Sequence, residues 1–131
     1  YVLETYPNVN LDLAARFQQF HRMDREKLRS FFIRFADRIL FGTDISQQPQ
    51  ADGPEGAAAR YLRCFKLLET GATVDRGFFG GQPAVGLALP PDVLEKIYYK
   101  NAVRIFPRVG EVLAQLGYEL VLAEKAEQGI E

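Results

Sequence analysis

The chain has 131 residues, of which 47% are hydrophobic and 25% charged, so we expect a packed domain rather than a disordered chain. The formal net charge is -1 without a basic or acidic block, which argues against nucleic acid or an anionic membrane surface as a partner. Cys64 is the only cysteine, which excludes an internal disulfide and favours a reducing, cytoplasmic setting. No apolar run approaches the roughly 18–20 residues that cross a membrane.

The first third of the chain predicts a strand, a helix and a second strand. Residues 8–15, NVNLDLAA, alternate polar and apolar side chains with the period of a strand. Residues 23–38, MDREKLRSFFIRFADR, carry apolar side chains at helical spacing, with Asp24 as the N-cap. Residues 38–44, RILFGTD, form a second short apolar run that stops at Gly42. The two strands of such a βαβ unit are parallel and joined by a right-handed crossover.

The remainder of the chain predicts mostly helix. Pro54 suits a first helical turn, Gly71 a helix end, and Pro107 stops the helix before it. The last segment breaks near Gly117 into one or two helices. The predicted segments are a loop over 45–56, a helix over 54–70, a Gly-rich loop with a short extended or hairpin piece over 71–90, a helix from about 91 to 106, and the helical segment over 108–128.

Two parallel strands make a poor sheet by themselves. Each leaves an open edge, and a sheet normally has three or more strands. The sequence also begins at Tyr1, and Met23 is its only methionine. We therefore expect a fragment or a processed product of a longer protein.

Two motifs, DRILFGTD at residues 37–44 and IYYKNAVRIF at residues 97–106, follow each other in this chain. Together they resemble the C-terminal part of the amidohydrolase superfamily, in the branch of amidohydrolase-2-type, decarboxylase-like (β/α)8 barrels. The first is similar to a run on the last barrel strand, and the second to a helix close to the chain end. Residues 6–16, YPNVNLDLAAR, are similar to the penultimate barrel strand.

The resemblance runs from about Tyr6 to Pro107 and covers the last quarter or third of such a barrel. It implies an α/β fold, namely the C-terminal portion of a (β/α)8 TIM barrel, with a βαβ unit followed by several helices. Residues 1–131 would form one partial barrel domain, with its strands at 8–15 and 38–44 and its helices from about 54 to 126.

The resemblance also implies a function. The branch contains metal-dependent hydrolases of amides, esters or lactones, and decarboxylases of small carboxylic acids. A divalent metal is implied, with zinc as the first choice. The family pattern places a His-x-His pair on the first strand and further histidines on middle strands, whereas this chain holds only His21. The alternative is a catalytically inactive truncated remnant that acts as a structural or associating fragment, as a homo-oligomer or with the remainder of the barrel.

Asp44 directly follows an apolar strand, and barrel enzymes place their catalytic groups at the C-terminal ends of strands. The resemblance implies that Asp44 contacts the metal and transfers protons between metal-bound water and the leaving group. The competing interpretation is that Asp44 caps the next turn with its side chain. Thr43, one residue earlier, points to the opposite side and is expected to give a supporting hydrogen bond.

Arg16 follows the first predicted strand and is our candidate for binding a substrate carboxylate bidentately. Asp12 would hold that guanidinium, or the two would form only a surface ion pair. His21 is expected to be an ordinary loop histidine rather than a ligand or general base, and Cys64 a small packed residue rather than a reactive thiol. By resemblance, Asn101 ties the last helix to the barrel through backbone hydrogen bonds.

The stretch GFFGG at residues 77–81 is a candidate lid over the site. Its glycines also resemble a phosphate-binding loop. It lacks the Lys-Ser/Thr pair and the strand-then-helix context of a P-loop, which excludes that interpretation.

Overall fold

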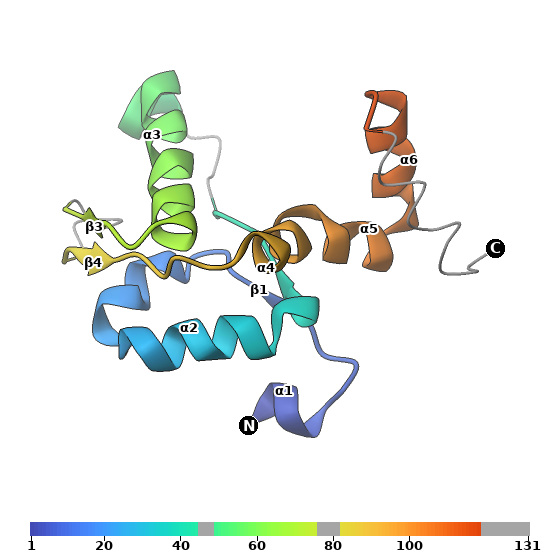
Figure 1. Cartoon of the computed structure of the whole chain (residues 1–131). Helices are drawn as coiled ribbons and strands as arrows, with labels where there is room; N and C mark the ends of the chain where they lie inside the picture. Colours follow the sequence, from blue (N-terminus) through green and yellow to red (C-terminus); the bar gives the residue numbers. More distant parts are fainter. Residues whose placement is uncertain (45–48, 76–81, 119–131) are drawn as a thin grey trace.

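The structure is a computed structural model and describes residues 1–44, 49–75 and 82–118, with side chains omitted for 49–55 (Figure 1). Short strands and 3-10 turns alternate with helices in the first third, and helices dominate the rest. The elements are α1 (Val2–Thr5), β1 (Leu11–Asp12), 3-10 helix η1 (Phe17–Arg22), α2 (Arg25–Arg34), 3-10 helix η2 (Ala36–Arg38), β2 (Ile39–Leu40), α3 (Pro49–Glu69), β3 (Thr73–Val74), β4 (Ala84–Val85), α4 (Pro91–Glu95), π-helix η4 (Lys96–Lys100), α5 (Asn101–Ile105) and α6 (Pro107–Gln115).

Strands β1 and β2 pair in parallel with α2 between them, as the βαβ pattern predicts. Leu11 lies opposite Ile39 and Asp12 opposite Leu40. The Leu13 N–H adds a bond of 3.0 Å to the Leu40 carbonyl. The paired segments are shorter than the predicted 8–15 and 38–44, because the chain turns directly after Leu13 and the 3-10 turn η2 precedes Ile39.

Helix α2 begins directly after Asp24, the residue that the sequence predicts as its N-cap. The Asp24 carboxylate accepts the Lys27 N–H at 2.8 Å and so satisfies one of the free donors of the first turn. The helix covers 25–34 rather than 23–38, since residues 36–38 wind into a 3-10 turn instead of continuing the α-helix.

Helix α3 begins at Pro49, so the prediction of a loop through residue 56 is wrong. Proline at a helix start loses no hydrogen bond, because the first N–H groups have no intrahelical partner. The helix ends at Glu69 before Gly71, as predicted, and the antiparallel pair β3–β4 confirms the predicted hairpin.

The third helical region is a near-continuous run from Pro91 to Ile105 that stops before Pro107, as predicted. In its middle, η4 forms one π-turn in which the Asn101 N–H reaches back to Lys96 O. Helix α6 ends at Gln115 and is followed by Gly117, whose φ of 89° only glycine adopts readily. The Gly117 and Tyr118 N–H groups close that end on Ala114 and Leu113, both at 3.0 Å. The segment after 118 lies outside the described residues.

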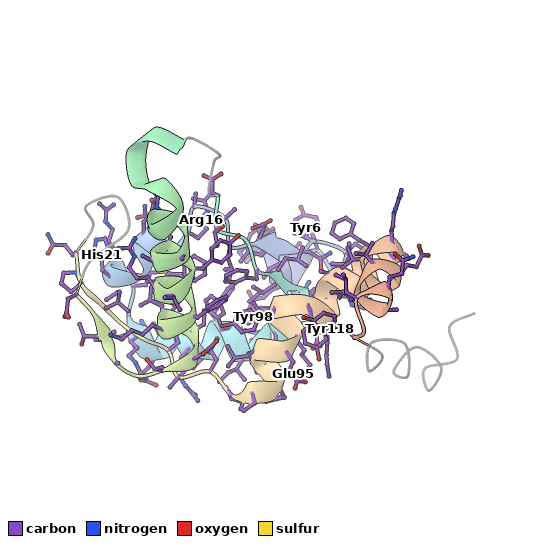
Figure 2. The ribbon with its side chains drawn as sticks, turned by 90° about the horizontal axis from the view of Figure 1, so that it is seen from above. Tyr6, Arg16, His21, Glu95, Tyr98 and Tyr118 are labelled. Atoms are coloured by element: carbon purple, nitrogen blue, oxygen red, sulfur yellow. The ribbon has the colours of Figure 1, made fainter. Side chains whose placement is uncertain are left out.

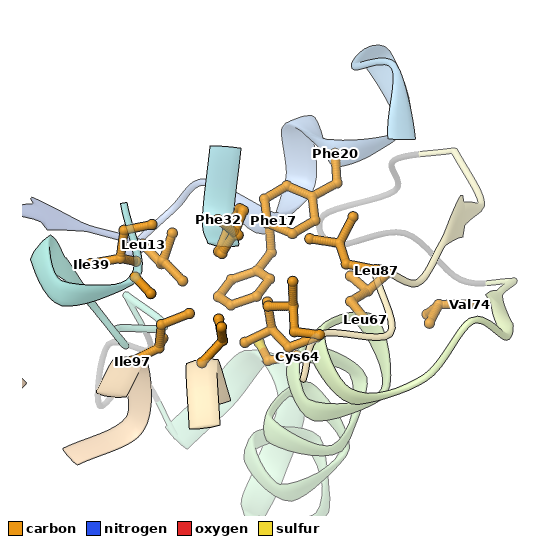
Figure 3. Close-up of a cluster of buried hydrophobic side chains, with 14 residues drawn as sticks. Leu13, Phe17, Phe20, Phe32, Ile39, Cys64, Leu67, Val74, Leu87 and Ile97 are labelled. Atoms are coloured by element: carbon orange, nitrogen blue, oxygen red, sulfur yellow. The ribbon is translucent and has the colours of Figure 1, made fainter. Parts of the chain in front are cut away.

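The apolar core lies against one face of the β1–β2 pair (Figure 3). Side chains alternate along a strand, so Leu11, Leu13 and Ile39 share this face, and all three belong to the core or pack on it. Helices α2, α3 and η4 supply the facing side chains, among them Phe32 and Leu67. The opposite face carries the exposed Asp12 and the half-buried Leu40 and Gly42.

Within the described ranges, no helix combines the length and the apolar character that a membrane span requires.

Candidate functional site

Asp44 lies four residues beyond Leu40, the last residue of β2, at the carboxyl end of the strand pair. Its side chain is exposed and its φ is 56°, in the left-handed region. That conformation costs an L-residue roughly 1–2 kcal/mol, although Asp tolerates it better than most. Its carboxylate makes no hydrogen bond to another described residue. Among the described residues, Asp44 thus presents an unpaired carboxylate from a left-handed backbone position after a strand end, and such backbone positions are enriched at functional sites.

The strand that leads to Asp44 is held by the third helical region. The buried Asn101 amide donates to the carbonyls of Ala36 at 2.7 Å and Ile39 at 2.8 Å. The Phe41 N–H donates to the Ile97 carbonyl at 3.0 Å. The expected structural role of Asn101 is therefore confirmed, and these bonds satisfy the groups on the edge of β2 that faces away from β1.

The ring of Phe41 anchors the same strand end on the core side. It stacks on Phe65 at 5.5 Å between ring centroids and meets Tyr98 edge-on at 5.3 Å. The Tyr98 hydroxyl donates to Glu69 Oε1 at 2.9 Å, and burial together with this carboxylate raises the pKa of Tyr98. The sequence pattern assigns Tyr98 only to an apolar stripe, because nothing local to it predicts a partner 29 residues away.

Arg16 is exposed (Figure 2). Because β1 and β2 are parallel, it follows β1 at the same end of the strand pair as Asp44. The predicted contact between Asp12 and Arg16 is wrong, since no ion pair joins these two described residues. The Asp12 carboxylate instead accepts the Ala14 N–H at 2.7 Å. An Asp side chain readily binds the backbone N–H two residues further on, which is closer along the chain than Arg16. The guanidinium of Arg16 is thus available to solvent.

The remaining candidates have structural settings. His21 is half-exposed in η1, and its Nε2 accepts the Arg22 Nε–H at 3.3 Å (Figure 2). Cys64 is buried in the core, and burial raises the pKa of its thiol to about 12, so the thiol stays protonated as a packing group. The predicted lid at 77–81 and the predicted turn cap after Asp44 lie outside the described residues.

A metal site does not fit the described residues by themselves. No group of three or more His, Cys, Asp or Glu side chains gathers anywhere in the described part of the chain. Divalent metals such as zinc require three or four protein ligands in almost every site. Asp44 therefore offers one carboxylate, without the partners that a metal would need.

A groove of about 740 Å³ lies between α1, β1 and α2. It contains neither Asp44 nor Arg16, and its walls are largely apolar, including Leu11, Phe31 and Phe35. The groove is therefore not the site around Asp44. Separately, the edge of β1 that faces away from β2 pairs with no strand among the described residues.

Comparison with protein-family models identifies a family for this chain. The model of the amidohydrolase family matches residues 1–108, a range that includes Asp12, Arg16, Asp44 and Asn101. No curated protein and no solved structure matches the chain. The match spans more than half of the sequence and contains both motifs that carry the resemblance. The chain therefore belongs to the amidohydrolase family.

Proposed function

We propose that this chain forms the C-terminal portion of a (β/α)8 amidohydrolase barrel and contributes Asp44 as its catalytic acid–base group. The reaction would be hydrolysis of an amide, ester or lactone, or loss of CO₂ from a small carboxylic acid. One observation carries the proposal: Asp44 stands exposed, with a φ of 56°, four residues beyond the end of β2 in the parallel pair. That is where barrel enzymes hold their catalytic side chains.

The chemistry assigned to Asp44 is proton transfer. A carboxylate at the strand end can accept a proton from an attacking water and return it to the leaving group. Phe41 and Asn101 hold the strand that precedes Asp44, so the carboxylate extends from backbone that is held in place. Such preorganisation keeps the acid within reach of a bound substrate.

Amidohydrolases generally use a divalent metal. In this proposal Asp44 supplies one oxygen ligand, and the imidazole ligands come from residues that this sequence does not contain, since His21 is its single histidine. Zinc is the metal that we propose. No step of the mechanism assigned to this chain depends on it.

Arg16 is the proposed substrate-binding residue. Its exposed guanidinium follows β1 at the same end of the strand pair as Asp44. Two parallel N–H donors suit the carboxylate of a small acid. This assignment favours a substrate with a carboxyl group and predicts a higher KM when Arg16 is replaced.

The second candidate function is association without catalysis. Because Leu13 N–H bonds to β2, the backbone groups of Asp12 face the unpaired edge of β1. The edge of β2 is already covered by Asn101 and Ile97. An added strand would therefore join at the unpaired edge of β1, as part of the remaining barrel or a second copy of the chain.

The two functions are separated by activity measured with and without added zinc, on ester, lactone, amide and carboxylic acid probes, in an assembly of this chain that supplies the imidazole ligands. The enzyme proposal predicts that Asp44→Asn lowers activity by about 100-fold or more. Asp75→Asn, an exposed acid on the β3 side of the molecule, is the matched control and should retain activity. Activity that survives Asp44→Asn would overturn the role of Asp44. An inactive chain that forms defined oligomers would support association.

A further inference from the structure

The carboxylate of Asp12 lies directly across the backbone of Gly42, two residues before Asp44. A Cβ atom added to Gly42 would be 2.2 Å from Asp12 Oδ1, 3.0 Å from Cγ and 3.2 Å from Oδ2. Real Cβ atoms essentially never come closer than 3.0 Å to another heavy atom. Glycine at 42 is therefore required for this close approach, and any larger residue must displace the carboxylate or the strand.

Asp12 is held in this position by its own turn. Its Oδ1 accepts the Ala14 N–H at 2.7 Å, and the chain then passes through Ala15 with a φ of 56°. Parallel register sets Asp12 opposite Leu40, so its side chain leans along β2 towards Gly42, on the same face of the pair. The carboxylate, held by this one hydrogen bond, therefore lies against the segment where β2 leaves the sheet.

We propose that Asp12 is a positioning residue for Asp44. Its carboxylate, held by Ala14, sets the path of residues 42–44 and so the left-handed backbone of Asp44. The inference rests on the proposed function for the importance of Asp44, but its geometry stands apart from any reaction. It replaces the expected contact of Asp12 with Arg16 by a contact with Gly42.

Asp12 acts on residues 42–44 through the shape of its side chain and one hydrogen bond, and not through its charge. Asparagine has the same shape and keeps the oxygen that accepts the Ala14 N–H, so Asp12→Asn should preserve the path of residues 42–44. Alanine lacks both the shape and the acceptor oxygen, so Asp12→Ala should free residues 42–44 from this path. Gly42→Ala should disturb Asp44 strongly in the parent chain and little once Asp12 is already alanine, because the atom it strikes is gone.

The test is solution NMR of the full chain, which reports the backbone of Asp44 without any need for activity. The three-bond HN–Hα coupling and the Cα and Cβ shifts of Asp44 distinguish a left-handed from an extended or averaged backbone. The variants are Asp12→Asn, Asp12→Ala, Gly42→Ala and the double variant. Gly71→Ala is the control, because a Cβ there would meet only Arg25 Nη2 at 3.8 Å, an ordinary contact.

The expected result is a left-handed signature in the parent chain, Asp12→Asn and Gly71→Ala, and its loss in Asp12→Ala and Gly42→Ala. An unchanged Asp44 signature in Asp12→Ala would overturn the proposal, as would equal effects of Gly42→Ala in both backgrounds. If Gly42→Ala fails to fold, the comparison of Asp12→Asn with Asp12→Ala decides by itself. Failure of the enzyme proposal leaves all of these spectra unaffected, so the two can fail separately.

Discussion

The two faces of the β1–β2 pair have opposite characters. One face carries Leu13 and Ile39, which lie in the core with the aromatic side chains of η1 and α2. The other face carries Asp12 and Gly42 and leads to the exposed Asp44. The difference teaches that packed and exposed side chains, and the proposed catalytic position among the latter, are separated by a single residue step along each strand. Substitutions on the packed face should therefore change unfolding, and those on the exposed face should change activity.

Removing an aromatic ring from the core that packs on this face should have the largest effect on the free energy of unfolding. Phe32 is 1% exposed and meets Phe20 and Phe31 edge-on at 5.8 and 6.1 Å. Phe32→Ala should lower the free energy of unfolding by about 3–5 kcal/mol, measured by urea denaturation. Ile33→Ala, at the neighbouring position that is 38% exposed, should cost much less. Equal losses for the two would mean that α2 does not pack as described.

The hydrogen bonds behind β2 should give the next largest effect. Asn101→Ala leaves the carbonyls of Ala36 and Ile39 without their donor in a buried setting. We expect a loss of about 1–3 kcal/mol in unfolding free energy. Asn8→Ala, at an exposed asparagine, should leave stability unchanged. A neutral Asn101→Ala would show that β2 is held without this amide.

The helix cap on α2 should contribute less. Asp24→Ala removes the acceptor of the Lys27 N–H and should cost about 1 kcal/mol. Asp24→Ser keeps an acceptor oxygen and should recover most of that loss in the same denaturation experiment. If serine and alanine behave alike, the cap bond is not the source of the effect.

Alkaline pH should lower the stability of the folded chain through the buried thiol of Cys64. Burial raises the folded pKa of this thiol to about 12, whereas an unfolded cysteine titrates near 8.5. The unfolded state therefore loses its proton first, and stability falls as pH rises through this window, by at most about 1 kcal/mol near pH 9. Cys64→Ala should decline less steeply over the same pH range. Identical slopes would rule out this thiol as the source.

The exposed face should show the smallest effect on stability. Asp44→Asn changes an exposed side chain with no hydrogen bond to another described residue, so its unfolding free energy should stay within about 0.5 kcal/mol of the parent. Activity, in contrast, should be lost. A marked destabilisation would mean that Asp44 is a structural residue and not the acid of a site.

Local rules predicted much of this molecule. Asp24 and Pro107 mark helix ends by chemistry that lies within one turn, and the alternation in NVNLDLAA predicted which face of β1 is polar. The start of α3 at Pro49 was missed, because the Gly and Pro residues that follow it favour a loop when taken alone.

The contacts that position the site were outside the reach of such rules. Gly42 and Asp12 are 30 positions apart and meet only after the strands pair, so no spacing in the sequence indicates them. Asn101 was identified through resemblance to a family motif, whereas its two acceptors, Ala36 and Ile39, emerge from the packing of η4 on β2.

The most direct test of the account is the metal content of the purified chain, measured together with its mass in solution after exposure to zinc. Because Asp44 offers a single ligand, we predict a metal-free monomer, with zinc retained only in an assembly that supplies further ligands and released by Asp44→Asn. Stoichiometric zinc on the monomer, or zinc in an assembly that Asp44→Asn leaves in place, would contradict the role given to Asp44.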